Sequence, residues 1–117
     1  MNIQIFGTKK CFDTKKAERF FKERNIKFQF IDLKEKTMSK GEFENVAKSV
    51  GIKDLINEKS KDYKKLNFEN IRSSEIKSEL LFKNQSVMVT PVVRNGRKAS
   101  AGYNPHIWEE WIEEDKK

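Results

Sequence analysis

The first 32 residues change from strand periodicity to helix periodicity and back, and this order constrains the fold more than any other feature. Residues 1–6 form a short apolar segment that predicts a buried strand, which Gly7 ends. Residues 27–32 predict a second strand. Between them one apolar stripe predicts a helix; its members are Ala17, Phe20, Phe21 and Arg24, the last through its aliphatic stem. A helix of this length predicts a right-handed crossover between two parallel strands.

The middle of the chain carries helix signals only. Ser39 and Glu42 form a capping box, which predicts a helix that Gly51 ends. Residues 52–83 predict short helical pieces. The last of these pieces is expected to begin with Ser73 or Ser74 as its cap and to bury Ile76, Leu80 and Leu81.

The end of the chain predicts two strands and a helix. Asn95-Gly96 is a strong hairpin signal, and residues 98–101 are expected to form the returning strand. Asn104-Pro105 predicts the start of a last helix, whose buried face is Ile107, Trp108, Trp111 and Ile112. The predicted α/β order is therefore βαβ, then helices, then ββα. A length of 117 residues without a linker or repeat predicts a single domain over residues 1–117.

Composition excludes several classes of protein. The chain has 25 Lys and Arg against 18 Asp and Glu, which gives a net charge of +7. Most of the basic residues are Lys, whereas base recognition favours Arg, so direct nucleic-acid binding is not expected. No apolar run approaches the roughly 20 residues of a membrane-spanning helix, and no signal-peptide pattern opens the chain. One Cys and one His exclude an intramolecular disulfide and a four-ligand zinc site. A lone Cys without an export signal predicts a cytoplasmic protein.

Cys11 is the one residue that can carry nucleophilic chemistry. It lies in the loop before the first helix, whose cap is expected at Asp13 or Thr14. Backbone N–H groups of residues 12–15 and the helix dipole would favour its thiolate, and nearby lysines add positive charge; these are Lys9, Lys10, Lys15 and Lys16. The alternative is an inert, half-buried Cys. His106, the only His, is expected on the surface rather than paired with Cys11.

Three blocks of residues carry a resemblance to a known family. The first runs from residue 5 to residue 17 and holds a single Cys with a basic residue four positions later. The second spans residues 54–66, and the third joins Thr90-Pro91-Val92-Val93 to Asn95-Gly96, Gly102-Tyr103 and the last helix. In this order and spacing they resemble the arsenate reductase-like branch of the thioredoxin superfamily, which includes the Spx regulators. The resemblance implies a thioredoxin-like α/β fold with a small mixed sheet and a helical insertion between the second and third strands.

The resemblance also implies a site. Cys11 corresponds to the family's thiolate nucleophile, Lys15 to the basic residue beside it, and Pro91 to a cis-proline that faces the thiol. The implied substrate-binding residues are Phe12, Asp13, Thr14, Lys59, Thr90 and Pro91. No bound cofactor or metal is implied. An external thiol, glutathione or an equivalent, or a glutaredoxin would regenerate Cys11.

Four positions depart from the family pattern. Thr90, Lys59 and Gly102 stand where arsenate-reducing members have Arg, so the guanidinium forks that grip an oxyanion are missing there. Thr14 stands where redox-switching Spx proteins have a second Cys. Whether Arg94 or Arg97 compensates for Thr90 is left open by the sequence.

Three functions follow from these observations. The first is a cytoplasmic thiol-dependent reductase in which Cys11 attacks a small oxyanion or a disulfide sulfur and an external thiol resolves the adduct. The second is an Spx-like regulator that binds RNA polymerase without a C-x-x-C switch. The third is a family scaffold that has lost its activity.

Overall fold

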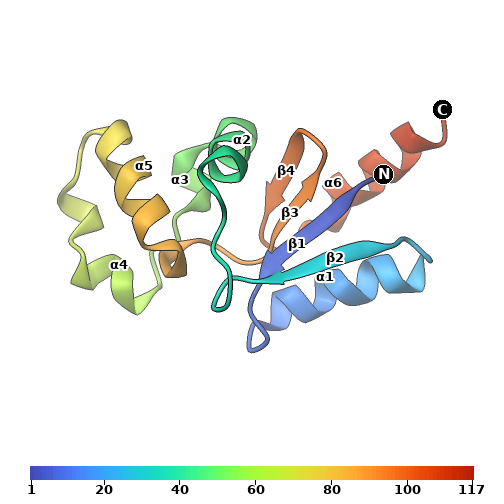
Figure 1. The fold of residues 1–117 in the computed structure, drawn as a ribbon, viewed down its shortest axis with the longest axis horizontal. Helices are drawn as coiled ribbons and strands as arrows, with labels where there is room; N and C mark the ends of the chain where they lie inside the picture. The colour runs from blue at the N-terminus through green and yellow to red at the C-terminus, as the bar shows by residue number, and fades with distance from the viewer.

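The computed structural model describes all 117 residues, and its centre is a four-stranded mixed sheet in the order β2-β1-β3-β4 (Figure 1). β1 (Ile3–Gly7) pairs in parallel with β2 (Phe28–Asp32), as the sequence predicts for the strand–helix–strand unit. β3 (Val92–Asn95) runs antiparallel to β1, and β4 (Lys98–Ala101) runs antiparallel to β3. With a helix bridging β1 and β2 and a helical insertion before β3, this is the predicted thioredoxin-like α/β fold.

The helix α1 (Phe12–Glu23) connects the two parallel strands and begins earlier than predicted. Cys11 itself is the N-cap: its backbone is extended, and its carbonyl accepts the Lys15 N–H at 3.2 Å. The predicted cap at Asp13 or Thr14 is therefore wrong. The reason is that the Thr14 side chain is fully buried against the sheet, which places that residue inside the first turn.

The remaining helices match the predicted order. They are α2 (Lys40–Val50), α3 (Ile52–Leu55), α4 (Lys61–Lys65), α5 (Ser74–Lys83) and α6 (Pro105–Asp115), with short 3₁₀ turns at Phe68–Asn70 and Gln85–Val87. The Ser39–Glu42 capping box is present, and Gly51 ends α2 with a positive φ of 95° that favours glycine. None of the helices is long and apolar enough to cross a membrane.

The cap of α5 is confirmed, but one of its predicted core residues is wrong. The Ser73 side chain accepts the Ile76 N–H, and Leu81 is completely buried. Ile76 is 54% exposed, because it lies in the first turn of α5 on the side away from the core. The predicted hairpin forms with Lys98–Ala101 as the returning strand, although its two turn residues are Gly96 and Arg97.

The two faces of the sheet are covered by different helices. α1 and α6 cover one face and enclose a core of Ile3, Ile5, Ala17, Phe20, Phe21, Val93, Trp108 and Trp111. α2 and the helical insertion cover the other, with Phe6, Leu33, Met38, Phe43, Val46, Leu55, Phe68, Leu81, Val87, Met88 and Val92. Adjacent strand residues such as Val92 and Val93 contribute to opposite cores, because successive side chains alternate across a sheet.

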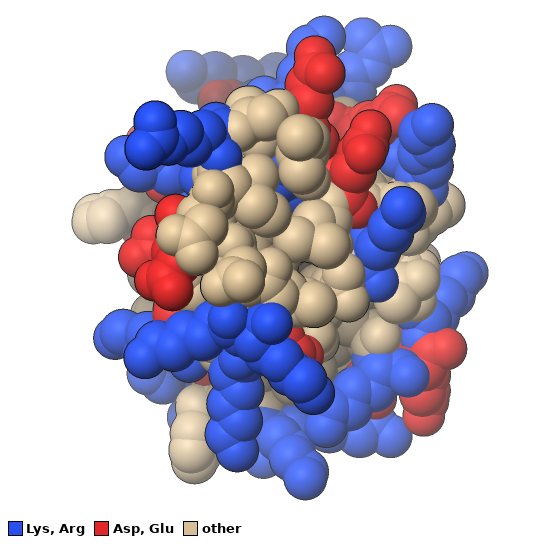
Figure 2. All heavy atoms as spheres, turned by 90° about the vertical axis from the view of Figure 1, so that its left-hand side faces the viewer, with Lys and Arg blue, Asp and Glu red and all other residues tan.

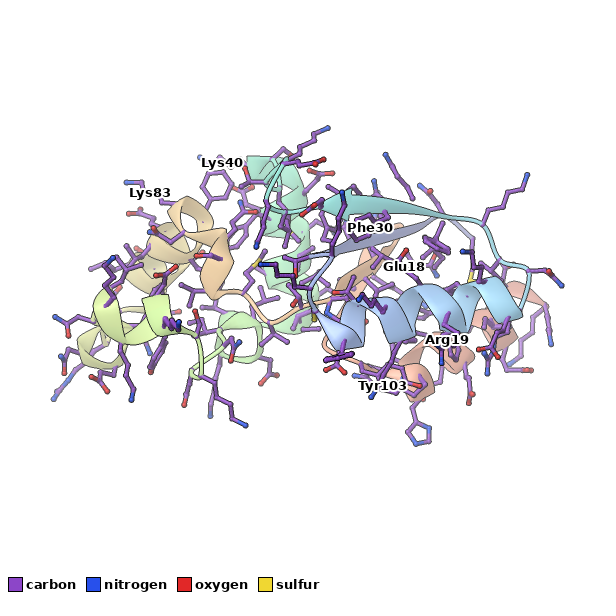
Figure 3. The ribbon with its side chains drawn as sticks, turned by 90° about the horizontal axis from the view of Figure 1, so that it is seen from below. Glu18, Arg19, Phe30, Lys40, Lys83 and Tyr103 are labelled. Carbon is purple, nitrogen blue, oxygen red and sulfur yellow. The ribbon has the colours of Figure 1, made fainter.

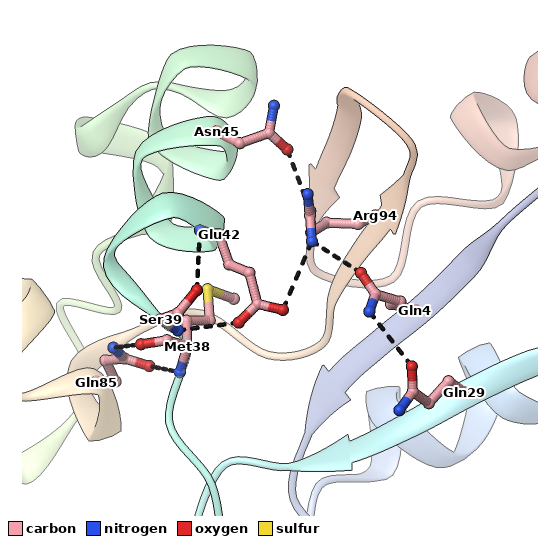
Figure 4. Close-up of polar contacts among 8 residues, drawn as sticks. All are labelled: Gln4, Gln29, Met38, Ser39, Glu42, Asn45, Gln85 and Arg94. Atoms are coloured by element: carbon pink, nitrogen blue, oxygen red, sulfur yellow. Dashed lines mark hydrogen bonds and ion pairs between the residues drawn. The ribbon is translucent and has the colours of Figure 1, made fainter.

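Two polar side chains, Gln85 and Arg94, fix the position of α2 (Figure 4). The buried Gln85 amide accepts the Met38 N–H at 2.7 Å and donates to the Met38 carbonyl at 3.1 Å, immediately before α2. On the other side, the Arg94 guanidinium donates to Asn45 at 3.1 Å and to Gln4 at 2.8 Å. Because buried polar groups must be paired to be tolerated, these contacts specify where α2 packs.

Candidate active site

Cys11 lies at the carboxyl end of β1, where the chain leaves the sheet and enters α1. Its N–H donates to the Thr8 carbonyl at 3.2 Å, and this turn presents the side chain at the helix N-terminus, partly exposed. In open α/β sheets this edge is where ligands gather. The sequence prediction that Cys11 lies between the first strand and the first helix is confirmed.

Thr90 forms the opposite wall of the site. Its hydroxyl donates to the Cys11 sulfur at 3.2 Å, and the thiol S–H points to the Thr90 carbonyl at 3.7 Å. The Thr90–Pro91 peptide bond is cis, as the resemblance implies. Two backbone hydrogen bonds position this segment: Val89 N–H to the Leu55 carbonyl at 2.7 Å, and Gly102 N–H to the Pro91 carbonyl at 2.8 Å.

The Thr14 hydroxyl is buried close to the thiol. It is the one buried side-chain polar atom with no hydrogen-bond partner of ordinary geometry, yet it is close enough to the Cys11 sulfur to lower the thiol pKa. An unpaired buried hydroxyl costs about 1–3 kcal/mol. A thiolate at Cys11 would supply the missing acceptor, so this hydroxyl is placed for the charged form of the site.

Gly7 makes room for Thr14. A Cβ atom placed on Gly7 would lie 2.6 Å from Thr14 Cγ2 and 3.0 Å from its Cβ, and closer still to its hydroxyl oxygen. The Thr14 side chain therefore occupies the space above the last residue of β1. The sequence predicts Gly7 only as the end of a strand. The one local signal of its further role is that Gly7 and Thr14 flank the Cys11 turn.

The pKa of Cys11 is lowered by hydrogen bonds. Burial alone would raise it, because burial disfavours the charged thiolate. The hydroxyls of Thr14 and Thr90 act in the opposite direction, and so do the backbone N–H groups of Thr14 and Asp13 in the first turn of α1. Together these donors outweigh burial, so the Cys11 pKa lies below that of an ordinary thiol.

The other predicted site residues are not all gathered at the sulfur. Lys15 is exposed, with its ammonium 5.8 Å from the centroid of the exposed Phe12 ring, and its side chain makes no hydrogen bond to Cys11. The Asp13 carboxylate pairs with Lys16 at 3.8 Å. Lys59 is exposed before α4, where its N–H donates to Asn57 at 3.1 Å. The donors that activate Cys11 are thus hydroxyls and backbone N–H groups.

No guanidinium takes the place of the missing arginines. Arg94 is engaged with α2 and β1, where its nearest carboxylate is Glu42 at 3.7 Å. Arg97 lies in the hairpin turn, and the pairing of Ile3 with Asn95 places that turn at the end of β1 opposite Cys11. At Gly102 a positive φ of 81° favours glycine, so the backbone and not a side chain contacts Pro91. Neither Arg94 nor Arg97 compensates for Thr90.

His106 and the acidic side chains add no further ligands to the site. His106 is exposed on α6 and makes no hydrogen bond, so it is not paired with Cys11. No group of three or more His, Cys, Asp and Glu side chains is placed to hold a metal ion.

Comparisons with known proteins agree on the fold. The model of the ArsC family matches residues 6–111. A Bacteroides fragilis protein described as ArsC family related has a TM-score of 0.83 at 22% identity, covering 94% of this chain and 97% of its own. An arsenate reductase from Vibrio cholerae has a TM-score of 0.82 at 20% identity, and the match covers 94% of this chain and 97% of that one. A Staphylococcus aureus protein has a TM-score of 0.77 at 26% identity, and the match covers 92% of this chain and 96% of that one. No curated protein matches the sequence.

Proposed function

This chain belongs to the ArsC family, and we propose that it is a thiol-dependent reductase in which the Cys11 thiolate attacks an electrophilic substrate. One observation carries the proposal: the Thr14 and Thr90 hydroxyls both lie close to the Cys11 sulfur and lower the pKa of its thiol. An inert structural Cys does not require a buried hydroxyl held without another partner. The arrangement therefore favours a reactive thiol over an inactive scaffold.

Of the two electrophiles open to such a thiolate, the donors around Cys11 favour a disulfide sulfur. Oxyanions are gripped by guanidinium forks, and no Arg side chain contacts Cys11 or Thr90. Thiol–disulfide exchange needs only a stabilised thiolate and an accessible sulfur. Arsenate reduction by this chain is therefore proposed to be slow compared with disulfide exchange.

The reaction has two exchange steps. The Cys11 thiolate attacks one sulfur of the substrate disulfide, a new S–S bond forms, and the other substrate sulfur leaves as a thiolate with the bonding electrons. Because Cys11 is the only Cys, no second thiol of this chain can resolve the adduct. A thiolate of glutathione or of a glutaredoxin attacks the mixed disulfide and releases Cys11. A reducing compartment such as the cytoplasm would supply that thiol.

Trapping of the adduct tests this function. The protein is incubated with glutathione disulfide at neutral pH, and its intact mass is measured before and after addition of excess reduced glutathione. We expect one glutathione per chain, located on Cys11, which the reduced thiol removes. Absence of the adduct, or an adduct that reduced glutathione does not release, would refute the proposal.

The alternative of an Spx-like regulator that binds RNA polymerase is favoured by one surface. Figure 2 looks onto the end of the molecule formed by α4 and α5, and Lys and Arg side chains gather in its lower half. The exposed lysines of this insertion include Lys61, Lys64 and Lys65. Recovery of RNA polymerase subunits on the immobilised protein, equally with the Cys11→Ser variant, would favour this role over the reductase.

A further inference from the structure

We propose that the disulfide substrate of Cys11 belongs to an acidic, extended segment of a partner protein, which binds to a rim of exposed aromatic rings and lysines around the thiol. The rim consists of Phe12, Tyr103, Lys9, Lys10, Lys15 and Lys16. This inference rests on the proposed function, because it names the class of substrate for the same thiol. The buried Thr14 hydroxyl close to Cys11, which has no other hydrogen-bond partner, is an independent observation that favours a sulfur anion there.

Phe12 is the first feature of the rim. It follows Cys11 directly and is 78% exposed, the highest fraction among the large hydrophobic residues. Its ring packs against no other aromatic ring, and the Lys15 ammonium lies 5.8 Å from its centroid. Covering a ring of this size is worth up to about 1.5–3 kcal/mol. A small oxyanion would leave this ring in water, whereas a peptide bound at Cys11 would cover it.

Tyr103 is the second aromatic residue of the rim. It is 44% exposed and lies beside α1 in the view from below (Figure 3). The hydrogen bond from Gly102 N–H to the Pro91 carbonyl ties it to the wall opposite Cys11. Its ring packs on Trp108 in a T-shaped arrangement with 5.6 Å between the ring centroids, and the Lys16 ammonium lies 5.4 Å from the Tyr103 ring centroid. Tyr103 is therefore a rigid, half-exposed ring, as suits a peptide contact.

The charge around the thiol sets the sign of the partner. Residues 8–16, which flank Cys11 in the sequence, hold four Lys against one Asp, so they carry +3 of the net charge of +7. Lys9, Lys10 and Lys15 are exposed and make no ion pair, and Lys16 pairs only with the half-exposed Asp13, at 3.8 Å. Unpaired ammonium groups around a site raise the encounter rate with an anionic partner by about 10–10³ at low salt.

Together these features favour a protein over other anions. A nucleic acid would satisfy the lysines but carries no disulfide for Cys11 to attack. An acidic segment that presents a disulfide offers a sulfur for the thiolate to attack, side chains that cover the rings and carboxylates that pair with the lysines. The step is an exchange: Cys11 bonds to the segment's sulfur, and the other half of the disulfide leaves as a thiolate.

Two matched peptides test this inference. Both have the same length and a central Cys in a mixed disulfide with thionitrobenzoate; one has Asp, Glu and Leu around the Cys, and in the other Lys replaces each acid. Release of thionitrobenzoate gives the second-order rate constant. At an ionic strength of about 0.01 M, we expect the acidic peptide to react about tenfold faster or more, and this ratio to approach one near 1 M.

Charge-reversal variants locate the rim. In Lys9→Glu/Lys10→Glu, we expect the ratio of acidic to basic peptide rates to fall below one. The control Lys22→Glu/Lys27→Glu changes the net charge equally at the other end of α1, about 15 Å away, and should keep the ratio above one. In Phe12→Ala, we expect the acidic-peptide rate to fall several-fold relative to that of bis(2-hydroxyethyl) disulfide, a small neutral substrate.

The outcomes separate this inference from the proposed function. Equal rates for the two peptides with the unmodified protein, or equal effects of the two charge-reversal pairs, would overturn the acidic partner while Cys11 still exchanges. An equal loss of both rates in Phe12→Ala would show that Phe12 acts on the thiol and not on the peptide. No reaction with the neutral disulfide would refute the reductase itself, and the substrate class with it.

Discussion

Replacing Cys11 by Ser is expected to abolish disulfide exchange. The serine hydroxyl is almost entirely protonated at neutral pH, and an oxygen cannot form the mixed disulfide on which the second step depends. Thr14 and Thr90 can then stabilise no thiolate, because none exists. We expect turnover with glutathione and a small disulfide to fall by at least about 10³-fold, as for the loss of other enzyme nucleophiles. The measurement is steady-state reduction at pH 7.

The control for this loss is the fold of the variant. Cys11 is only partly buried and its sulfur packs in neither core, so the midpoint of thermal unfolding should change little. A Thr37→Val variant, altered at an exposed position between β2 and α2, should retain full turnover. Full turnover by Cys11→Ser would contradict the reductase, and retained binding of RNA polymerase would then favour the regulator.

Gly7→Ala is expected to damage both the fold and the site. The new methyl group would lie 2.6 Å from Thr14 Cγ2, and the Thr14 side chain has no free space into which to move because it is completely buried. Overpacking of this kind costs about 1–3 kcal/mol. Displacement of Thr14 also removes a hydroxyl that lowers the Cys11 pKa, so the alkylation midpoint of Cys11 should move to higher pH.

Gly41→Ala is the matched control. Gly41 lies in α2, and a Cβ there meets nothing within 4 Å. Replacing Gly by Ala at a helical position without a steric conflict stabilises a protein by about 0.4–1 kcal/mol, so this variant should be more stable than the unmodified protein, with no change at Cys11. If denaturant unfolding shows the two alanine variants equally stable, the packing of Thr14 over Gly7 is not as described.

Local signals account for much of the fold. The alternation of strand and helix periodicity before residue 33 predicts the parallel pair β1 and β2, and Ser39 with Glu42 predicts the start of α2, because these signals depend on neighbouring residues alone. The position of Cys11 follows from the same order. The cis peptide at Thr90–Pro91 came from the resemblance to a family and not from the residues themselves.

The details of the site depend on contacts between distant segments. The donor from Thr90 reaches Cys11 across 79 positions of sequence, and nothing local to Cys11 predicts it. The lysines near Cys11 in the sequence predict a charged environment for the thiol. The Lys15 ammonium instead lies over the exposed Phe12 ring, because it keeps its hydration at that exposed position. The exposure of Ile76 likewise depends on which side of α5 packs against the core. The apolar residues of α5 have only a weak helical periodicity, so the sequence does not determine that side.

The central claim is that hydroxyl groups activate Cys11 against the effect of burial, and substitution of both hydroxyls isolates their contribution. Thr14→Val and Thr90→Val keep the shape of the side chains and remove the donors. Thr14→Val also removes an unpaired buried hydroxyl, so it should not lower the free energy of unfolding. With both hydroxyls gone, only the backbone N–H groups of Asp13 and Thr14 still oppose the effect of burial, so the Cys11 pKa should rise.

The most direct measurement is the pH dependence of Cys11 alkylation by iodoacetamide, since only the thiolate reacts. For the unmodified protein and for Thr37→Val, the rate should reach half its plateau below pH about 8.5, the value of a free thiol. For the Thr14→Val/Thr90→Val double variant, the midpoint should rise clearly above that of the unmodified protein. A midpoint at the free-thiol value in the unmodified protein, or one that the double variant does not move, would contradict the activation of Cys11 by these hydroxyls.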